Sequence, residues 1–266
     1  AYLATNTETV EKSFGRHVHW GYWETPEQAS LTVDEFAQST ENLSKLLIKA
    51  ANISNGQAIL DVGCGFGGTI ASLNETYTGL RLVGLNIDER QLDRARQHVH
   101  AVVDNTIEFQ QGDACALPFP DNSFDAVLAV ECIFHFSSRE QFFKEAHRVL
   151  KPGGYLALSD FIQSGFSPFR LLTQTNSSFF GTCDVRYTKA KYHTLAKASN
   201  FVVCVDKNIT KNTLPTYKYL KALFIDKYKM QQVTDIMLAF LTTFSIEFIS
   251  RLHLLSYYIF VFKKPI

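Results

Sequence analysis

The sequence predicts an α/β protein built on a doubly wound, mostly parallel sheet of seven strands. Between Ala58 and Asp160, short apolar runs alternate with amphipathic stretches, which is typical of strands connected by helices. The apolar runs are nearly continuous, as expected when helices cover both faces of a sheet. Such a sheet binds its ligand beyond the carboxyl ends of its strands, so candidate site residues are those that follow the strands.

The expected elements follow from this alternation in chain order. A helix is expected from Thr32 to Ala50, because Thr32 and Glu35 fit a capping box at its start. Strands are expected at 58–62, 81–85, 106–109, 124–130, 155–161, 201–205 and 256–262. Further helices are expected at 88–99, 139–150, 187–199 and over most of 217–251.

A single domain is expected, because the chain has no repeat, no low-complexity tract and no linker. We divide it into an N-terminal helical cap (1–55), a ligand-binding core (56–163) and a region that holds a lid and the remaining strands (164–266). Phe-rich segments at 161–185 and 212–250 interrupt the succession of strands and are predicted to form a lid, helical near the C-terminus, over the ligand edge. Packing explains the first of these segments equally well.

Composition limits the classes of function. The chain has 266 residues, 46% of them hydrophobic, and 26 basic residues balance 26 acidic ones. A packed globular protein without a basic surface for nucleic acid is therefore expected. The longest apolar stretches, 236–246 and 252–262, cover about 11 residues each, fewer than a bilayer-spanning helix needs. We expect small-molecule partners, no stable membrane insertion, and a monomer by default, with a dimer left open.

The cysteine pattern bears on the compartment. Five cysteines without a C-x-x-C pair argue against a disulfide framework and against a zinc site. The first ten residues have neither the basic nor the apolar part of a secretion signal, although a leader removed before Ala1 is left open. A reducing, cytoplasmic location is expected.

A glycine loop follows the first strand of the core and predicts a cofactor site. Gly63, Gly65 and Gly68 open a helix, where backbone N–H groups can approach a ligand closely. They also satisfy G-x-G-x-x-G with Asp88 twenty residues after Gly68, so a dinucleotide stays open as the ligand. Asp61 favours another ligand, because a carboxylate before the loop repels a pyrophosphate and attracts a cationic amino-acid cofactor.

Later motifs strengthen the second interpretation. The segments VGLNID, GDACALPFPDNSFDAV and HRVLKPGGYLALSD follow the glycine loop in order, and HWGYW precedes it. Together they resemble the class I S-adenosylmethionine (SAM)-dependent methyltransferases over about residues 56–163. The resemblance is greatest to the natural-product branch that contains tocopherol methyltransferases and the rebeccamycin sugar O-methyltransferase. It implies a Rossmann-like fold, SAM as cofactor and S-adenosylhomocysteine as product.

The resemblance also implies which residues bind the cofactor. Asn86 stands where the family usually has an acidic residue for the ribose hydroxyls, a departure shared by the tocopherol-type branch. An amide still offers one donor and one acceptor there, and a strand cap is its alternative role. The other implied contacts are Asp61, Gly63, Cys64 and Gly65 at the methionine end, Ile87, Gln91, Asp113 and Ala114 at the adenosine, Val130 and Glu131 at the methionine end of the fourth strand, and Tyr22 and Trp23 over the sulfonium.

Two residues are implied as catalytic. Natural-product O-methyltransferases place a histidine and an aspartate at the positions of His135 and Asp160, so His135 is expected to act as general base, oriented by Asp160. A packing role for His135 stays open, and His17 and His19 are weaker candidates for the base. The cysteines are expected to be small buried residues rather than nucleophiles.

The expected reaction is methylation of a hydroxyl on an apolar natural product. The Phe-, Leu- and Tyr-rich lid with few carboxylates favours an acceptor with a large apolar part. N-methylation of a similar scaffold and C-methylation stay open, as do an NAD-dependent oxidoreductase and a SAM-binding protein that transfers nothing. No metal site is expected, although Asp160 and Asp184 could supply oxygen ligands.

Overall fold

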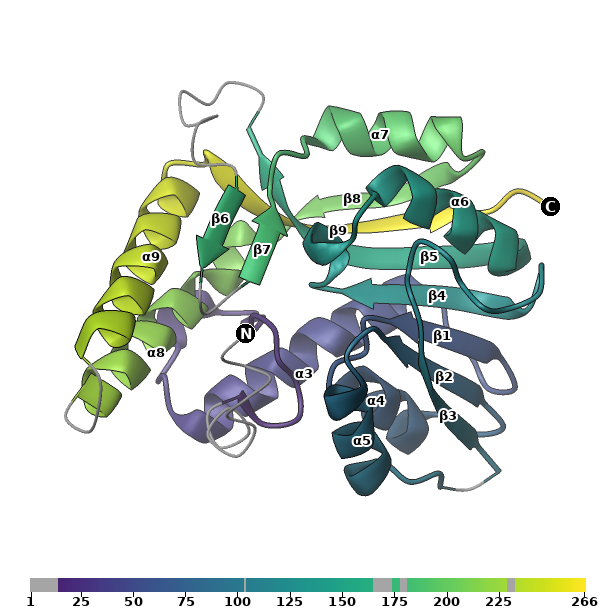
Figure 1. Cartoon of the computed structure of the whole chain (residues 1–266), viewed down its shortest axis with the longest axis horizontal. Helices are drawn as coiled ribbons and strands as arrows, with labels where there is room; N and C mark the ends of the chain where they lie inside the picture. Colours follow the sequence, from purple (N-terminus) through teal and green to yellow (C-terminus); the bar gives the residue numbers. More distant parts are fainter. Residues whose placement is uncertain (1–13, 103, 165–173, 178–180, 229–232) are drawn as a thin grey trace.

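The fold consists of one large sheet with helices on both faces (Figure 1), in agreement with the predicted class. The computed structural model describes residues 14–102, 104–164, 174–177, 181–228 and 233–266. The seven strands lie in the order β3-β2-β1-β4-β5-β9-β8. Their bounds are β1 Ala58–Val62, β2 Arg81–Asn86, β3 Thr106–Gln111, β4 Phe124–Val130, β5 Leu150–Gln163, β8 Val202–Asn208 and β9 Leu255–Lys263.

The topology locates the ligand edge. Strands β1 to β5 pair in parallel, whereas β9 is antiparallel to both β5 and β8. The order of strands reverses between β1 and β4, because β2 and β3 lie on one side of β1 and the later strands on the other. The carboxyl ends of β1 and β4 therefore flank the switch point at which such sheets bind ligands.

Alternate residues of the strands pack against different helices. Leu60 and Val62 of β1 belong to the core cluster that contains Phe142 of α6 and Tyr192 of α7. Ile59 belongs to the opposite cluster, with residues of α3 and α4. This covering of both faces explains why the strands are almost continuously apolar. The helix bounds are α3 Val33–Ala50, α4 Gly68–Thr76, α5 Glu89–His98, α6 Arg139–Val149 and α7 Lys189–Ala198, with short 3₁₀ helices η1 Pro26–Gln28 and η2 Ile133–His135.

The N-terminal helix α3 begins as the sequence indicates. The Thr32 hydroxyl accepts a hydrogen bond from the Glu35 N–H at 3.2 Å, as an N-cap does. Phe36, Leu43 and Leu47 of α3 are buried in a cluster that also contains residues of the C-terminal region, such as Tyr217. The N-terminal segment is thereby held against the C-terminal helices beside the ligand edge.

The region after β5 differs in detail from the expectation. Helix was expected over most of 217–251, and two helices, α8 (Thr210–Tyr228) and α9 (Val233–Arg251), lie there between β8 and β9 and form the left side of the molecule in Figure 1. Residues 174–177 and 181–184 form a separate antiparallel pair, β6 (Gln174–Ser177) and β7 (Gly181–Asp184). The rest of the Phe-rich stretch between 165 and 180 lies outside the described residues.

The division of the chain at 55 and 163 stays a prediction.

Among the described residues, no helix combines the length and the apolarity needed to cross a bilayer.

Candidate cofactor and methyl-acceptor site

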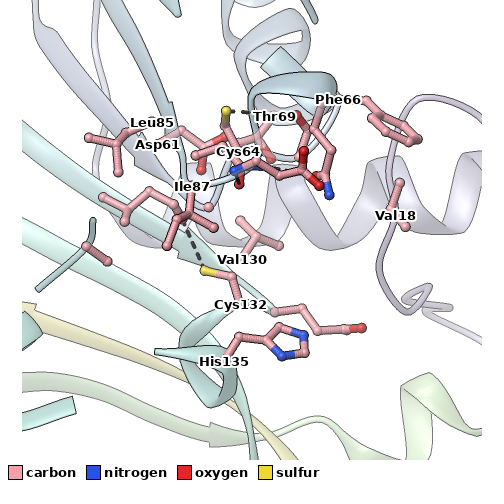
Figure 2. Close-up of a pocket in the computed structure, with 18 of the residues that line it drawn as sticks. Val18, Asp61, Cys64, Phe66, Thr69, Leu85, Ile87, Val130, Cys132 and His135 are labelled. Atoms are coloured by element: carbon pink, nitrogen blue, oxygen red, sulfur yellow. Dashed lines mark hydrogen bonds between the residues drawn. The ribbon is translucent and has the colours of Figure 1, made fainter. Parts of the chain in front are cut away.

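A cavity of about 580 Å³ opens at the carboxyl ends of β1, β2 and β4. The glycine loop and the start of α4 form one wall, the turn after β4 forms another, and residues 16–19 close one side. In Figure 2, Asp61 and Cys64 lie on one side of this space and His135 lies across from them, with Val18 approaching from the N-terminal segment. The cavity therefore has the position expected for a ligand of a doubly wound sheet.

Two positions of the loop require glycine. Gly63 has φ +73°, and a Cβ there would lie 2.7 Å from Cβ of Cys132. A Cβ on Gly68, the first residue of α4, would lie 2.6 Å from the Arg16 carbonyl oxygen and equally close to Nδ1 of His17. The glycines thus let the loop approach the β4 turn on one side and the N-terminal segment on the other.

Two backbone N–H groups of the loop are bonded to the neighbouring strand. The N–H groups of Gly63 and Cys64 both donate to the Leu85 carbonyl oxygen, at 2.7 and 3.1 Å. These two donors anchor the loop to β2 and are not free to bind a ligand. Gly63, Cys64 and Gly65 nevertheless all line the cavity, where the sequence places the methionine end of the cofactor.

Asp61 is the strongest sign of a missing cationic partner. Its side chain lines the cavity but is only 1% exposed, and its Oδ2 atom has no hydrogen-bond partner. Burial raises the pKa of this carboxyl to about 8. A buried carboxyl without a partner is costly to the free protein, and the ammonium group of an amino-acid cofactor would complete it. The residues present therefore fit SAM.

The predicted adenosine contacts line the same cavity. They are Asn86, Ile87, Gln91, Asp113 and Ala114. Asn86 donates to Oε1 of Gln91 at 3.1 Å and accepts from the Asp88 N–H at 3.2 Å. The Asp113 carboxylate accepts from the Cys115 N–H at 2.8 Å, which fixes the turn after β3. Asn86 thus combines the expected position beside the cofactor with the alternative role of a strand cap.

Asp88, the acid required for a dinucleotide, has a structural role. It is the N-cap of α5, accepting from the Arg90 N–H at 3.1 Å, and it forms an ion pair with the Arg90 side chain at 2.7 Å. Its carboxylate is therefore committed to α5, which counts against binding of ribose hydroxyls in an NAD site.

Glu131 follows β4 directly and lines the cavity. It has φ +51°, which is unusual for a residue with a side chain, and its N–H donates to Oγ of Ser159 at 3.0 Å. Its Oε2 accepts from the Trp20 N–H at 2.9 Å and from the Tyr257 hydroxyl. Burial raises the pKa of this carboxyl to about 8. These contacts tie the N-terminal segment and β9 to the end of β4.

His135 lines the cavity at the end of η2 and is exposed. Figure 2 shows its ring on the opposite side of the space from Asp61 and Cys64. Its Nδ1 atom lies 4.0 Å from Sγ of Cys183 in β7, and its ring packs edge-on against Phe134. His135 is thus accessible to a substrate and held from two sides.

The structure does not bring Asp160 to His135. Asp160 is fully buried and does not line the cavity. Its Oδ2 accepts from the Arg139 guanidinium at 2.8 Å and from the Tyr192 hydroxyl, and its Oδ1 accepts from the Phe161 N–H. The predicted role of Asp160 in orienting His135 is wrong, because Arg139 of α6 holds the carboxylate within the protein interior. Arg139 also lies 3.7 Å from the Asp184 carboxylate, which counts against these acids as metal ligands.

Tyr22 and Trp23 also lie elsewhere than expected. Neither lines the cavity. The Tyr22 N–H donates to the Ser39 carbonyl oxygen at 2.8 Å, and Nε1 of the buried Trp23 donates to Glu35 at 3.2 Å. The HWGYW segment therefore anchors the N-terminal region on α3. Tyr22 and Trp23 do not reach the cavity in which they were expected to cover the sulfonium.

A polar network that the sequence interpretation missed forms the N-terminal wall. His17 and His19 line the cavity, but as buried residues whose ring nitrogens lie 3.2 Å apart. Nε2 of His17 lies 2.8 Å from Glu41, which also binds Arg16. Burial lowers the pKa of His19 to about 3, so this ring is neutral. The H-x-H spacing was visible in the sequence, but the buried acid on α3 was not.

The cavity cysteines fit the packing interpretation. Burial raises the pKa values of Cys64 and Cys132 well above the ordinary thiol value. Both groups are therefore neutral thiols near pH 7 and lack the thiolate that a nucleophile needs.

The sheet order, the switch-point cavity and the unpartnered Asp61 define a Rossmann-like protein that binds a cationic cofactor. Residues 60–158 match the methyltransferase domain family. The chain therefore contains a class I SAM-dependent methyltransferase domain of the natural-product type, and SAM is the cofactor of that class.

Curated relatives match part of the chain. The methyltransferase GfsG of Streptomyces halstedii is 35% identical over 62% of this chain and 58% of its own length. Erythromycin 3''-O-methyltransferase of Saccharopolyspora erythraea is 31% identical over 75% of this chain and 66% of its own. A sterol 24-C-methyltransferase of Gibberella zeae is 42% identical over 42% of this chain and 30% of its own. The chain spans between 55% and 60% of the length of the first three curated relatives it matches.

Solved structures share the fold over the whole chain. The cyclase SpnF is 22% identical with a TM-score of 0.78, covering 100% of this chain and 94% of its own. A sarcosine dimethylglycine methyltransferase from Galdieria sulphuraria is 21% identical with a TM-score of 0.78, covering 94% of each chain. At this identity the likeness concerns the fold alone.

Proposed function

We propose that this protein transfers a methyl group from SAM to a hydroxyl group of an apolar small molecule, with His135 as general base. The observation that carries the proposal is one cavity with an unpartnered buried carboxyl, Asp61, on one side and an accessible imidazole, His135, on the other. The relatives named 27-O-demethylrifamycin SV methyltransferase and erythromycin 3''-O-methyltransferase support hydroxyl methylation.

The bound cofactor supplies a methyl group already activated by a sulfonium, so the protein mainly has to position the reactants and exclude water. Asp61 holds the cationic amino-acid end in a buried place. Asn86 and Asp113 border the other end of the same cavity. His135 accepts the proton of the acceptor hydroxyl as the new bond forms, a task that suits a neutral imidazole near pH 7.

The remaining wall of the cavity supports an apolar acceptor. Val18, Phe66, Cys132 and Phe136 line it together with His135. Apolar walls with a few polar groups are typical of pockets that bind small organic molecules. A natural product with a hydroxyl on a mainly apolar scaffold fits this wall better than a small charged amine.

C-methylation is a second candidate, because several relatives are named sterol 24-C-methyltransferases. A carbon acceptor has no hydroxyl proton to lose as the bond forms. The two candidates therefore differ in how strongly the transfer depends on a base at His135.

Two measurements test the proposal. Calorimetric titration with SAM, S-adenosylhomocysteine and NAD should show micromolar binding of the two adenosyl ligands and none of NAD. Methyl transfer from radiolabelled SAM is then measured on hydroxylated macrolides and on sterols, which also separates an enzyme from a protein that only binds the cofactor. Binding of NAD alone, or no transfer to any acceptor, would contradict the proposal.

His135→Ala tests the base. It should lower transfer to a hydroxyl acceptor by about 10²-fold or more while affinity for S-adenosylhomocysteine is retained. His193→Ala is a matched control, because His193 is an exposed residue of α7 paired with Asp206. Unchanged turnover in His135→Ala would remove His135 from the mechanism.

A further inference from the structure

Helix α9 carries an apolar stripe on its outer face. Met237, Leu241, Phe244, Phe248 and Leu252 are each 52–54% exposed. Their spacing of three or four residues places them on one side of the helix. In Figure 1, α9 (yellow-green) forms the outer left edge of the molecule, away from the large sheet.

The opposite face of α9 is already packed, with Thr243, Glu247 and Ser250 buried on it. Phe240, Ile246 and Ile249 contact the core cluster that contains Tyr217 of α8 and Leu255 of β9. A contiguous apolar stripe that stays exposed on a helix whose other face is packed marks an interaction site. The stripe therefore fits a partner that covers it when the protein is at work.

A group of cations adjoins the end of this stripe. Lys211, Lys218 and Arg251 line a small pocket of about 170 Å³ together with Glu27, Leu214 and two prolines. Arg251 follows Phe248 by three residues, so it lies beside the stripe on the same helix. Arg251 is paired with Glu247, but Lys211 and Lys218 have no ion pair among the described residues.

The composition of this region has the same bias. The chain as a whole has equal numbers of basic and acidic residues. Residues 210–252 hold six basic residues and only three acidic ones. The helical hairpin that carries the exposed apolar stripe therefore has an excess of three basic residues, whereas the chain as a whole has none.

We propose that the α9 stripe and the adjoining cations form a docking surface for an anionic lipid bilayer. The apolar side chains enter the acyl region at the interface, and Lys211, Lys218 and Arg251 lie among the anionic headgroups, as in interfacial amphipathic helices. A second copy fits this surface less well, because two-fold pairing brings identical cationic surfaces together. The helix lies on the bilayer and does not cross it.

This surface is separate from the cofactor cavity, so the docking proposal does not depend on the proposed methyl transfer. None of the five stripe residues and none of the three cations lines the cofactor cavity. The two proposals can therefore fail independently.

Flotation of the full chain with vesicles tests the docking surface. Vesicles of phosphatidylcholine with about 30% phosphatidylglycerol should bind the protein at low ionic strength, and pure phosphatidylcholine vesicles should bind it much less. Leu241→Ser combined with Phe248→Ser should weaken binding by at least about tenfold. Lys211→Gln and Lys218→Gln should each weaken it by about fivefold.

Matched controls separate the surface from general effects. Val202→Ser changes an apolar side chain on β8 that is also exposed, and Lys144→Gln and Lys197→Gln remove charge from exposed positions of α6 and α7. These controls should bind vesicles like the unaltered chain. Thermal unfolding and S-adenosylhomocysteine affinity should be the same for all variants, which shows that each is folded.

Three results would overturn the docking proposal. One is equal binding, or no binding, to the two kinds of vesicle. Another is an equal loss of binding in the stripe variants and in Val202→Ser. The third is a dimer in sedimentation velocity that Leu241→Ser with Phe248→Ser dissociates, which would make a second copy the occupant of the stripe.

Discussion

Two buried aspartates lie on parallel strands of the same sheet, and they differ in whether the protein itself supplies a partner. Asp61 on β1 lines the cavity with an oxygen that has no hydrogen bond. Asp160 on β5 has Arg139, Tyr192 and a backbone N–H as partners and does not line the cavity. A buried carboxylate whose hydrogen-bond partners come from the protein itself stabilises the fold, whereas a buried carboxylate without such partners can bind a ligand.

The largest expected effect concerns stability at Asp160. Asp160→Ala leaves Arg139 buried with its main partner removed, so the free energy of unfolding should fall by about 3–5 kcal/mol. Chemical denaturation measures it. Asp206→Ala removes an exposed pair with Lys189 and should cost about 1 kcal/mol or less. Equal costs at the two positions would show that the Arg139 contact does not stabilise the fold.

Asp61 should behave in the opposite way. Asp61→Asn removes the charge that holds the cationic end of the cofactor, so calorimetric affinity for S-adenosylhomocysteine should fall by about 10- to 100-fold, as expected for a charge-assisted hydrogen bond. The free variant should be at least as stable as the unaltered protein, because no buried carboxylate needs a partner. If Asp61→Asn lowered stability but kept the affinity for S-adenosylhomocysteine, Asp61 would act in the fold as Asp160 does, and the proposed difference between the two aspartates would be wrong.

The pH dependence of binding follows from the raised pKa of Asp61. In the free protein the carboxyl has a pKa of about 8, and a bound ammonium favours the ionised form. Affinity should therefore rise with pH up to about 8, by at most about tenfold per pH unit. Calorimetry in buffers of different ionisation enthalpy should show proton release on binding near pH 7.

Variants identify the group that releases this proton. Glu131 also has a pKa of about 8, so Glu131→Gln is the control and should keep the pH dependence that Asp61→Asn loses. The stability of the free protein changes with pH in the opposite direction. Because the folded-state pKa of Asp61 is raised, the contribution of this group to stability is fully present below about pH 4 and is lost progressively as the pH rises to about 8.

The smallest effect is expected at Trp23. Trp23→Phe removes the hydrogen bond to Glu35 and should lower the free energy of unfolding by about 0.5–1.5 kcal/mol. Cofactor affinity should not change, because Trp23 does not line the cavity. A loss of affinity without a loss of stability would restore the expected closure over the sulfonium.

Much of the site follows from short sequence segments. The glycine loop with Asp61, the residues after β2 and the turn at Asp113 each lie next to the strand that positions them. Periodicity therefore identified both the strand and the residue at its end. The partners of those residues were less predictable. Arg139 meets Asp160, and Glu41 meets His17, only because distant segments pack together.

The sequence by itself determined the sheet, the cofactor class and the cavity residues that follow strands, because these depend on local spacing and on residue chemistry. The tertiary structure alone decided that Asp160 and Trp23 serve the fold, that His17 and His19 form a wall of the cavity, and that one apolar face of α9 points outward. The physical reason is that a side chain's role depends on which distant groups satisfy its charge, hydrogen bonds or apolar surface. Tertiary packing determines which distant groups meet a side chain, and the periodicity of the sequence does not reveal them.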